Sequence, residues 1–311
     1  MIRFLILIFL IGIDTAGGSN MLTTLLGLGD TKLNPDILTY VMSVAGIVQG
    51  MLLMLAPTLS LKMYGTNDKS LDLRVHAEFV GAAVLTCGVC CLCLFVLHLD
   101  AMKTLGFASL VWAAEHVKVL VNEYPTKLGY SRNGHIVWLL FSIAIIHACF
   151  VSASYTHQLL VAGDGLFALN TILVIINPST HSKIYGFKEM KFSDDQKDWL
   201  RAFGYENLAM CVFSLSLVNG VEAHKALGLM SMVVVAHCAH SLVGNWNLGM
   251  LGTFLMYSWM IFHASCSANF VSTEVAYLMT SVIITVTTMK IPSVPSNFEF
   301  PQVESEKLAT K

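Results

Sequence analysis

The chain has 311 residues, of which 55% are hydrophobic and only 12% are charged. An ordinary soluble protein carries roughly 25% charged residues, so this chain has too little charge to cover the surface of a soluble globule. The net charge of −2 comes with no basic stripe, which argues against nucleic acid as a partner. Lipid must be the main solvent, and we predict an all-α integral membrane protein.

Residues 1–19 have the composition of a secretory signal peptide. Arg3 precedes a short apolar run from Phe4 to Ile13, and small residues follow Asp14. The run is too short to span a bilayer. We therefore predict entry by the secretory route, with the plasma membrane, an endomembrane or a plastid membrane as the destination. The alternative is a short interfacial helix that is retained.

Apolar runs of about 20 residues predict nine transmembrane helices. They cover residues 36–56, 75–98, 103–121, 135–155, 158–178, 200–219, 225–243, 248–270 and 273–290. Lysine and arginine gather in loops 57–74, 122–134 and 179–199, whereas the opposite loops have little more than Lys103 and Lys225. Because basic loops stay in the cytoplasm, we predict these three loops and the polar tail 291–311 to be cytoplasmic.

An internal repeat predicts a tandem duplication of a four-helix unit. The first unit covers residues 36–155 and the second covers 158–271, and a ninth helix follows at 273–290. Matching segments are Pro57 to Gly65 with Pro178 to Gly186, Leu73-Arg74 with Leu200-Arg201, Ala101 to Gly106 with Ala223 to Gly228, and Ile145 to Ala148 with Ile261 to Ala264. Each unit has an even number of helices, so the copies should be related by an axis along the membrane normal.

Several residues are predicted to shape the helix packing. Gly46 and Gly50 form a Gly-x-x-x-Gly pair, which favours a close helix contact in membranes. We expect Tyr64 and Tyr185 to pack beside Pro57 and Pro178, where helices end at the membrane interface. Asp164 lies between two glycines, and it would either break the fifth helix or cap its start; we favour the cap.

Ionisable residues inside the predicted spans are the first candidates for function, because polar groups in lipid are costly. They are His76, Glu78, Glu115, His116, Lys118, Glu206, His237 and His240. The repeat aligns Glu115 with His237 and Lys118 with His240. Helical spacing allows Arg74 to pair with Glu78, and Glu115 with Lys118. Two interpretations stay open: a proton relay or ligand pocket, or structural charges that pair near the interface.

His147 and His263 are the second set of candidates. Each lies near the middle of its span in an Ile-x-His-Ala context, followed by small residues that favour a helix contact. We therefore predict that both face the interior of the bundle. Buried imidazoles can ligate haem iron or chlorophyll magnesium, or carry protons. They can equally form structural hydrogen bonds to a neighbouring helix.

The motifs of soluble enzymes are missing from the sequence. We expect a non-enzymatic transport protein, ligand-binding protein or structural subunit of a membrane complex. The alternatives are an intramembrane redox or pigment-binding protein that uses the histidines, and a lipid-modifying enzyme that uses the region of Glu115. The expected partners are the bilayer and other membrane subunits, and the sequence specifies no cofactor.

Overall fold

The computed structural model of the protein describes residues 34–68, 70–179, 192–244, 246 and 248–271. The predicted signal peptide 1–19, the ninth helix 273–290 and the tail 291–311 lie outside these residues, as does Tyr185. All regular elements of the described part are helices. They are α3 (Pro35–Leu55), α4 (Pro57–Met63), α5 (Leu71–Cys91) with its π-helical extension η1 (Leu92–Val96), α6 (Ala101–Val121), α7 (Tyr124–Leu128), α8 (Asn133–Val151), α9 (Thr156–Ile176), α11 (Asp194–Val218), α12 (Ala223–Val243) and α13 (Gly249–Phe270).

Six of the described helices are long and apolar enough to cross a membrane: α3, α5 with η1, α6, α8, α9 and α12. Large apolar side chains such as Val137, Leu140, Leu166 and Phe254 are exposed on the outside of the bundle, where lipid would cover them. A helix also satisfies its own backbone hydrogen bonds, as a spanning segment must. The protein is therefore an all-α, multi-spanning membrane protein.

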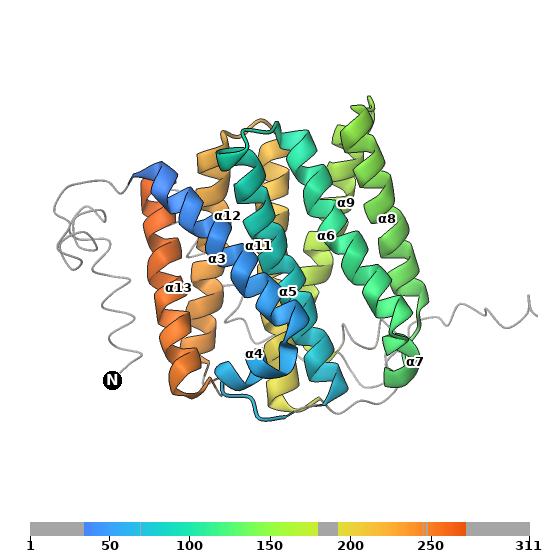
Figure 1. Ribbon diagram of the computed structural model, residues 1–311, viewed down its shortest axis with the longest axis vertical. Coiled ribbons are helices and arrows are strands. Elements are labelled where there is room, and N and C mark those ends of the chain that lie inside the picture. The colour runs from blue at the N-terminus through green and yellow to red at the C-terminus, as the bar shows by residue number, and fades with distance from the viewer. Residues whose placement is uncertain (1–33, 69, 180–191, 245, 247, 272–311) are drawn as a thin grey trace, which may run out of the picture.

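Helices α5 and α11 form the centre of the bundle (Figure 1). They pack against each other, and each also packs against two flanking helices: α3 and α6 for α5, and α9 and α12 for α11. Helix α8 then packs against α6, and α13 packs against α12. The short helices α4 and α7 lie at one end of the bundle, and the α5–α6 and α8–α9 turns lie at the other (Figure 1).

Glycines bring α3 close to α5. A Cβ atom built on Gly46 would lie 2.9 Å from the Cα of Gly88, and one built on Gly50 would lie 2.4 Å from the backbone nitrogen of Leu85. No side chain larger than hydrogen fits between these backbones without movement. The Gly-x-x-x-Gly pair thus lies at the α3–α5 crossing.

Helix α9 runs without a break through Asp164, so both interpretations of this residue, as a helix break and as a cap, are wrong. The Asp164 carboxylate instead accepts a hydrogen bond from the Ser214 hydroxyl of α11. Because a neighbouring helix satisfies the carboxylate, it does not compete for backbone groups of its own helix. Asp164 therefore joins two helices.

Candidate functional site

Two internal cavities lie between the described helices. The first, cavity A, has a volume of about 990 Å³ including its open part and lies among α3, α5, α11, α12 and α13. Its wall is mostly apolar, and the residues with polar or aromatic character are Gln49, Tyr64, Thr66, Asp195, Asp198, Trp199, Glu206, His237, Trp246, Trp259 and His263. Three of the predicted site residues, Glu206, His237 and His263, therefore meet in one cavity.

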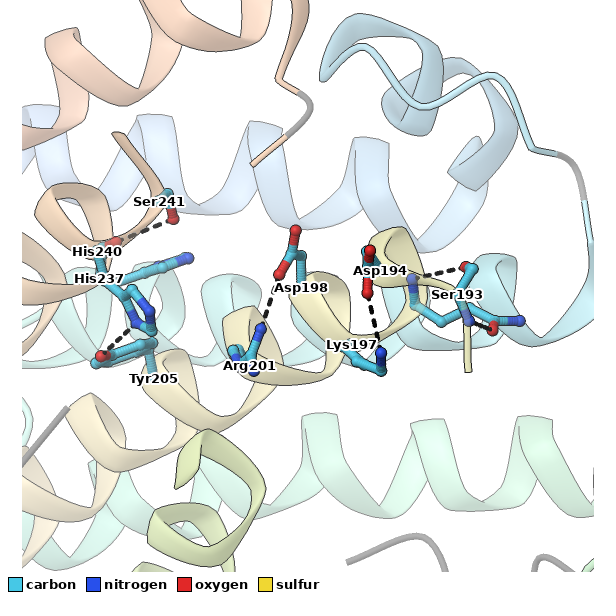
Figure 2. A network of polar contacts seen from close by, with 10 residues as sticks. Ser193, Asp194, Lys197, Asp198, Arg201, Tyr205, His237, His240 and Ser241 are labelled. Atoms are coloured by element: carbon cyan, nitrogen blue, oxygen red, sulfur yellow. Dashed lines mark hydrogen bonds and ion pairs between the residues drawn. The ribbon is translucent and has the colours of Figure 1, made fainter. Parts of the chain in front are cut away.

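The centre of cavity A is an interhelical pair between Glu206 of α11 and His237 of α12. Glu206 Oε1 lies 2.7 Å from His237 Nδ1. Tyr205 stacks on the imidazole with ring centroids 5.3 Å apart, and its hydroxyl lies 2.9 Å from Nδ1 of His240, as Figure 2 shows. The other ring nitrogen of His237, Nε2, is buried and has no hydrogen-bond partner among the described residues. The wall of cavity A thus contains one unsatisfied polar atom.

His263 also belongs to the wall of cavity A. Its side chain is buried on α13, and its Nδ1 lies 3.2 Å from the Ser231 hydroxyl of α12. The ring of Trp259 lies 5.3 Å away between centroids. His263 therefore forms the predicted hydrogen bond to a neighbouring helix, and it also lines a cavity.

The prediction that His147 faces the interior is wrong, because its side chain is exposed. On α8, His147 continues the exposed row of Ile136, Leu140 and Ile143, whereas the adjacent Ala148 lies on the buried face. A helix turns by about 100° per residue, so a small residue next to His147 does not mark the same face. Helices α8 and α13 lie on opposite sides of the bundle (Figure 1), so His147 and His263 form no joint site.

The end of cavity A nearest α4 is acidic and aromatic. Tyr64 accepts a hydrogen bond of 2.6 Å from the Gln49 amide of α3, and its ring meets the Trp199 ring edge-on at 5.7 Å. On the first turns of α11, the guanidinium group of Arg201 lies 3.0 Å from the carboxylate of Asp198 and forms an ion pair with it (Figure 2). Burial raises the pKa of Tyr64, so its hydroxyl stays protonated. Pro57 begins α4, and Pro178 follows α9.

Cavity B has a volume of about 1370 Å³ including its open part and lies among α5, α6, α8, α9 and α11. His116 and His135 face each other in its wall with 3.2 Å between their Nδ1 atoms, and His135 Nε2 lies 3.1 Å from the Tyr130 hydroxyl. Phe79 stacks on His135 with an interplanar angle of 12°. His135 was not among the predicted site residues, because it lies at the very start of a predicted span, where a histidine can reach water.

Of the remaining candidates, His76 of α5 lines cavity B, and the other three form a charged cluster between α5 and α6. Lys118 Nζ lies 2.9 Å from Glu78 and 3.7 Å from Glu115, and it donates a 3.0 Å hydrogen bond to the Met54 carbonyl. Glu78 is thus paired with Lys118 instead of with Arg74. Glu115 is fully buried and lines neither cavity. Within the described residues, no group of three or more histidine, cysteine, aspartate or glutamate side chains is arranged to hold a metal ion.

Helices that are long and apolar enough to cross a membrane, with two mostly apolar cavities between them, define a multi-spanning α-helical membrane protein. Comparison with protein-family models, with curated proteins and with solved structures found no match. The function must therefore be argued from the site itself.

Proposed function

We propose that the protein binds a small molecule in cavity A and acts as a non-enzymatic ligand-binding or transport protein of a membrane. The observation that carries this proposal is the Glu206–His237 pair in the wall of a mostly apolar cavity. Small-molecule sites combine an apolar wall with a few placed polar groups. Ionisable groups inside a membrane bundle are costly and usually serve a ligand, an ion or a proton.

Cavity A is favoured over cavity B because its wall carries an interhelical carboxylate–imidazole pair, Glu206 with His237. In cavity B, His116, His135 and Tyr130 form a chain in which each member contacts the next, and Asp164 is bonded to Ser214. Each cavity also has one buried imidazole nitrogen without a partner among the described residues, Nε2 of His237 in cavity A and Nδ1 of His76 in cavity B. A buried polar atom without a partner costs free energy that a ligand can recover.

The test is to identify small molecules that co-purify with the protein from its native membrane. The purified protein is extracted with solvent, and the extract is analysed by mass spectrometry. Ala209 lines cavity A and Ala108 lines cavity B, and both are buried on helices. Ala209→Leu should remove the bound molecule, whereas the matched variant Ala108→Leu should keep it. Extracts that contain only bulk lipid, or equal loss in both variants, would contradict the proposal.

We also propose that the bundle is a tandem duplication of units 36–155 and 158–271, with α5 and α11 beside the axis that relates them. The order of helix contacts supports this: α3–α5, α5–α6 and α6–α8 in the first unit correspond to α9–α11, α11–α12 and α12–α13 in the second. The turns before α6 and α12 both contain a residue with positive φ, His98 at 52° and Gly220 at 79°. The sequence repeat aligns these two positions.

The two cavities support the duplication independently. When each helix is replaced by its counterpart in the other unit, the helices that surround cavity A become those that surround cavity B. Aligned positions line both cavities in the following pairs: Met42 with Gly163, Gln49 with Asn170, Cys87 with Ser214, Phe79 with Glu206, Ala108 with Met230, Trp112 with Val234, and His116 with Cys238. On the outer helices, the spacing of Trp138, Phe141 and Ile145 equals that of Met256, Trp259 and His263.

This last register offers a reason for the wrong prediction about His147. The cavity-lining positions align His263 with Ile145, two residues before His147. The Ile-x-His-Ala similarity instead aligns His263 with His147, which lies on the exposed face of its helix. An experimental structure in which residues 36–151 do not superpose on residues 158–270 would contradict the duplication.

A further inference from the structure

The charge and the aromatic wall of cavity A select a class of ligand. We propose that cavity A binds a protonated organic amine, with its ammonium group at Glu206 and His237 and its apolar part against the tryptophan rings. This inference rests on the proposed function and names the ligand class of the same cavity.

The ionisable side chains of cavity A give it a negative charge. Asp195, Asp198 and Glu206 line cavity A, and among the described residues no lysine or arginine does so. Arg201 neutralises Asp198, which leaves Asp195 and Glu206 without a lysine or arginine partner within the described part of the chain. Asp195 lies outside the predicted span 200–219, and burial together with repulsion from Asp68 and Asp194 raises the pKa of its carboxyl group. A cation would meet attraction at both positions.

The Glu206–His237 pair offers hydrogen-bond acceptors to a ligand. When His237 is neutral and donates from Nδ1 to Glu206, its Nε2 is an acceptor. Nε2 has no partner among the described residues, and the His237 side chain is only 8% exposed. An ammonium group has several N–H donors and no acceptor, so it can donate to the Glu206 carboxylate or to Nε2, which lie on opposite sides of the imidazole ring. An anionic group would instead meet a carboxylate and an acceptor nitrogen.

Tryptophan rings lie beside the histidines in the wall of cavity A. Trp246 lies 5.7 Å from the His237 ring, and Trp259 lies 5.3 Å from the His263 ring, between centroids. Cations bind favourably over aromatic faces within about 6 Å, and tryptophan is the best of these. The rings also offer an apolar surface for the carbon part of an amine.

Cavity B provides the internal comparison. In cavity B, the position that aligns with Glu206 is occupied by Phe79. Cavity B does contain a carboxylate, that of Asp164, but it accepts a hydrogen bond from Ser214. If both cavities merely reflected gaps between helices, neither would distinguish ligands by charge. The proposal instead places the preference for a cation in cavity A alone.

The experiment is isothermal titration of the full chain in phosphatidylcholine nanodiscs with three compounds of matched shape. Cyclohexylammonium is the cation, cyclohexanol is the neutral compound and cyclohexanecarboxylate is the anion, and empty nanodiscs correct for partition into lipid. The wild type should bind the cation about tenfold more tightly than either other compound, the scale expected for a hydrogen bond to a charged group. Glu206→Gln should lose this preference and Glu206→Asp should keep it, while the cavity B control Asp164→Asn should behave as the wild type.

Other outcomes overturn the inference in distinguishable ways. If cyclohexanol binds as tightly as the cation and Ala209→Leu removes both, cavity A is a binding site but the ligand class is wrong. If the anion binds best, or Glu206→Gln retains the preference, the role of Glu206 is wrong. If none of the three compounds binds to the wild type, the amine class is rejected, and the co-purification experiment separately decides the proposed function. Should Glu206→Gln fail to fold, the three titrations of the wild type still decide.

Discussion

Lys118 of α6 lies 2.9 Å from the carboxylate of Glu78 on α5, and Glu78 is almost completely buried. In the duplication that we propose, these positions align with His240 of α12 and Tyr205 of α11, and the Tyr205 hydroxyl lies 2.9 Å from Nδ1 of His240. The proposed units would thus share one interhelical contact, made by an ion pair in the first unit and by a hydrogen bond in the second.

Substitution of Lys118 should destabilise the protein strongly. Lys118→Met leaves Glu78 and Glu115 without a cation, and loss of one partner of a buried pair costs about 3 kcal/mol or more. Thermal unfolding in detergent measures the effect. Lys103→Met is the matched control, because Lys103 and Asp100 form a 3.0 Å pair in which both side chains are 54% exposed. Equal effects of the two substitutions would contradict the structural role of Lys118.

The α3–α5 crossing should not tolerate a methyl group. Gly50→Ala would place a Cβ atom 2.4 Å from the backbone of Leu85, and overpacking of this kind costs about 1–3 kcal/mol. Gly165 of α9 is the control, because a Cβ atom built there meets no atom within 4 Å. Gly165→Ala should leave stability unchanged or raise it by up to about 1 kcal/mol, since alanine favours helix. The prediction fails if Gly50→Ala unfolds at the wild-type temperature.

The stability of the ligand-free protein should depend on pH through Asp198. Burial outweighs the attraction of Arg201 and raises the pKa of Asp198 from 3.8 to about 6. Because the folded-state pKa is the higher one, the contribution of this group to stability is fully present below pH 4 and is lost as pH rises through about 6. Asp198→Asn should therefore match the wild type in Tm near pH 4 and exceed it modestly at pH 7. A Tm difference that is the same at both pH values would contradict this assignment.

Much of the fold follows from the sequence because hydropathy and glycine spacing are strong local signals. Six of the predicted spans coincide with helices that are long and apolar enough to cross a membrane, and the Gly46–Gly50 pair lies at a helix crossing. Helix α11 carries Asp194, Asp195 and Lys197 before its apolar part, so hydropathy alone marks its start late.

The candidate site is less predictable, because a cavity depends on which helices meet. Glu206, His237 and His263 are identifiable as costly polar groups, but their convergence comes from the contacts of α11, α12 and α13. The tryptophans of cavity A give no such signal, since tryptophan is common at membrane interfaces. His147 shows the converse error: a histidine deep in an apolar run can still lie on an exposed helix face.

The most direct test of the binding cavity is a high-resolution density map of the protein purified from its native membrane in mild detergent. Our account predicts a compact non-protein density in cavity A, in contact with Glu206 and His237 and bordered by Trp259. A cavity A that is closed by its own side chains, or filled only by a phospholipid chain that enters from the bilayer, would contradict it.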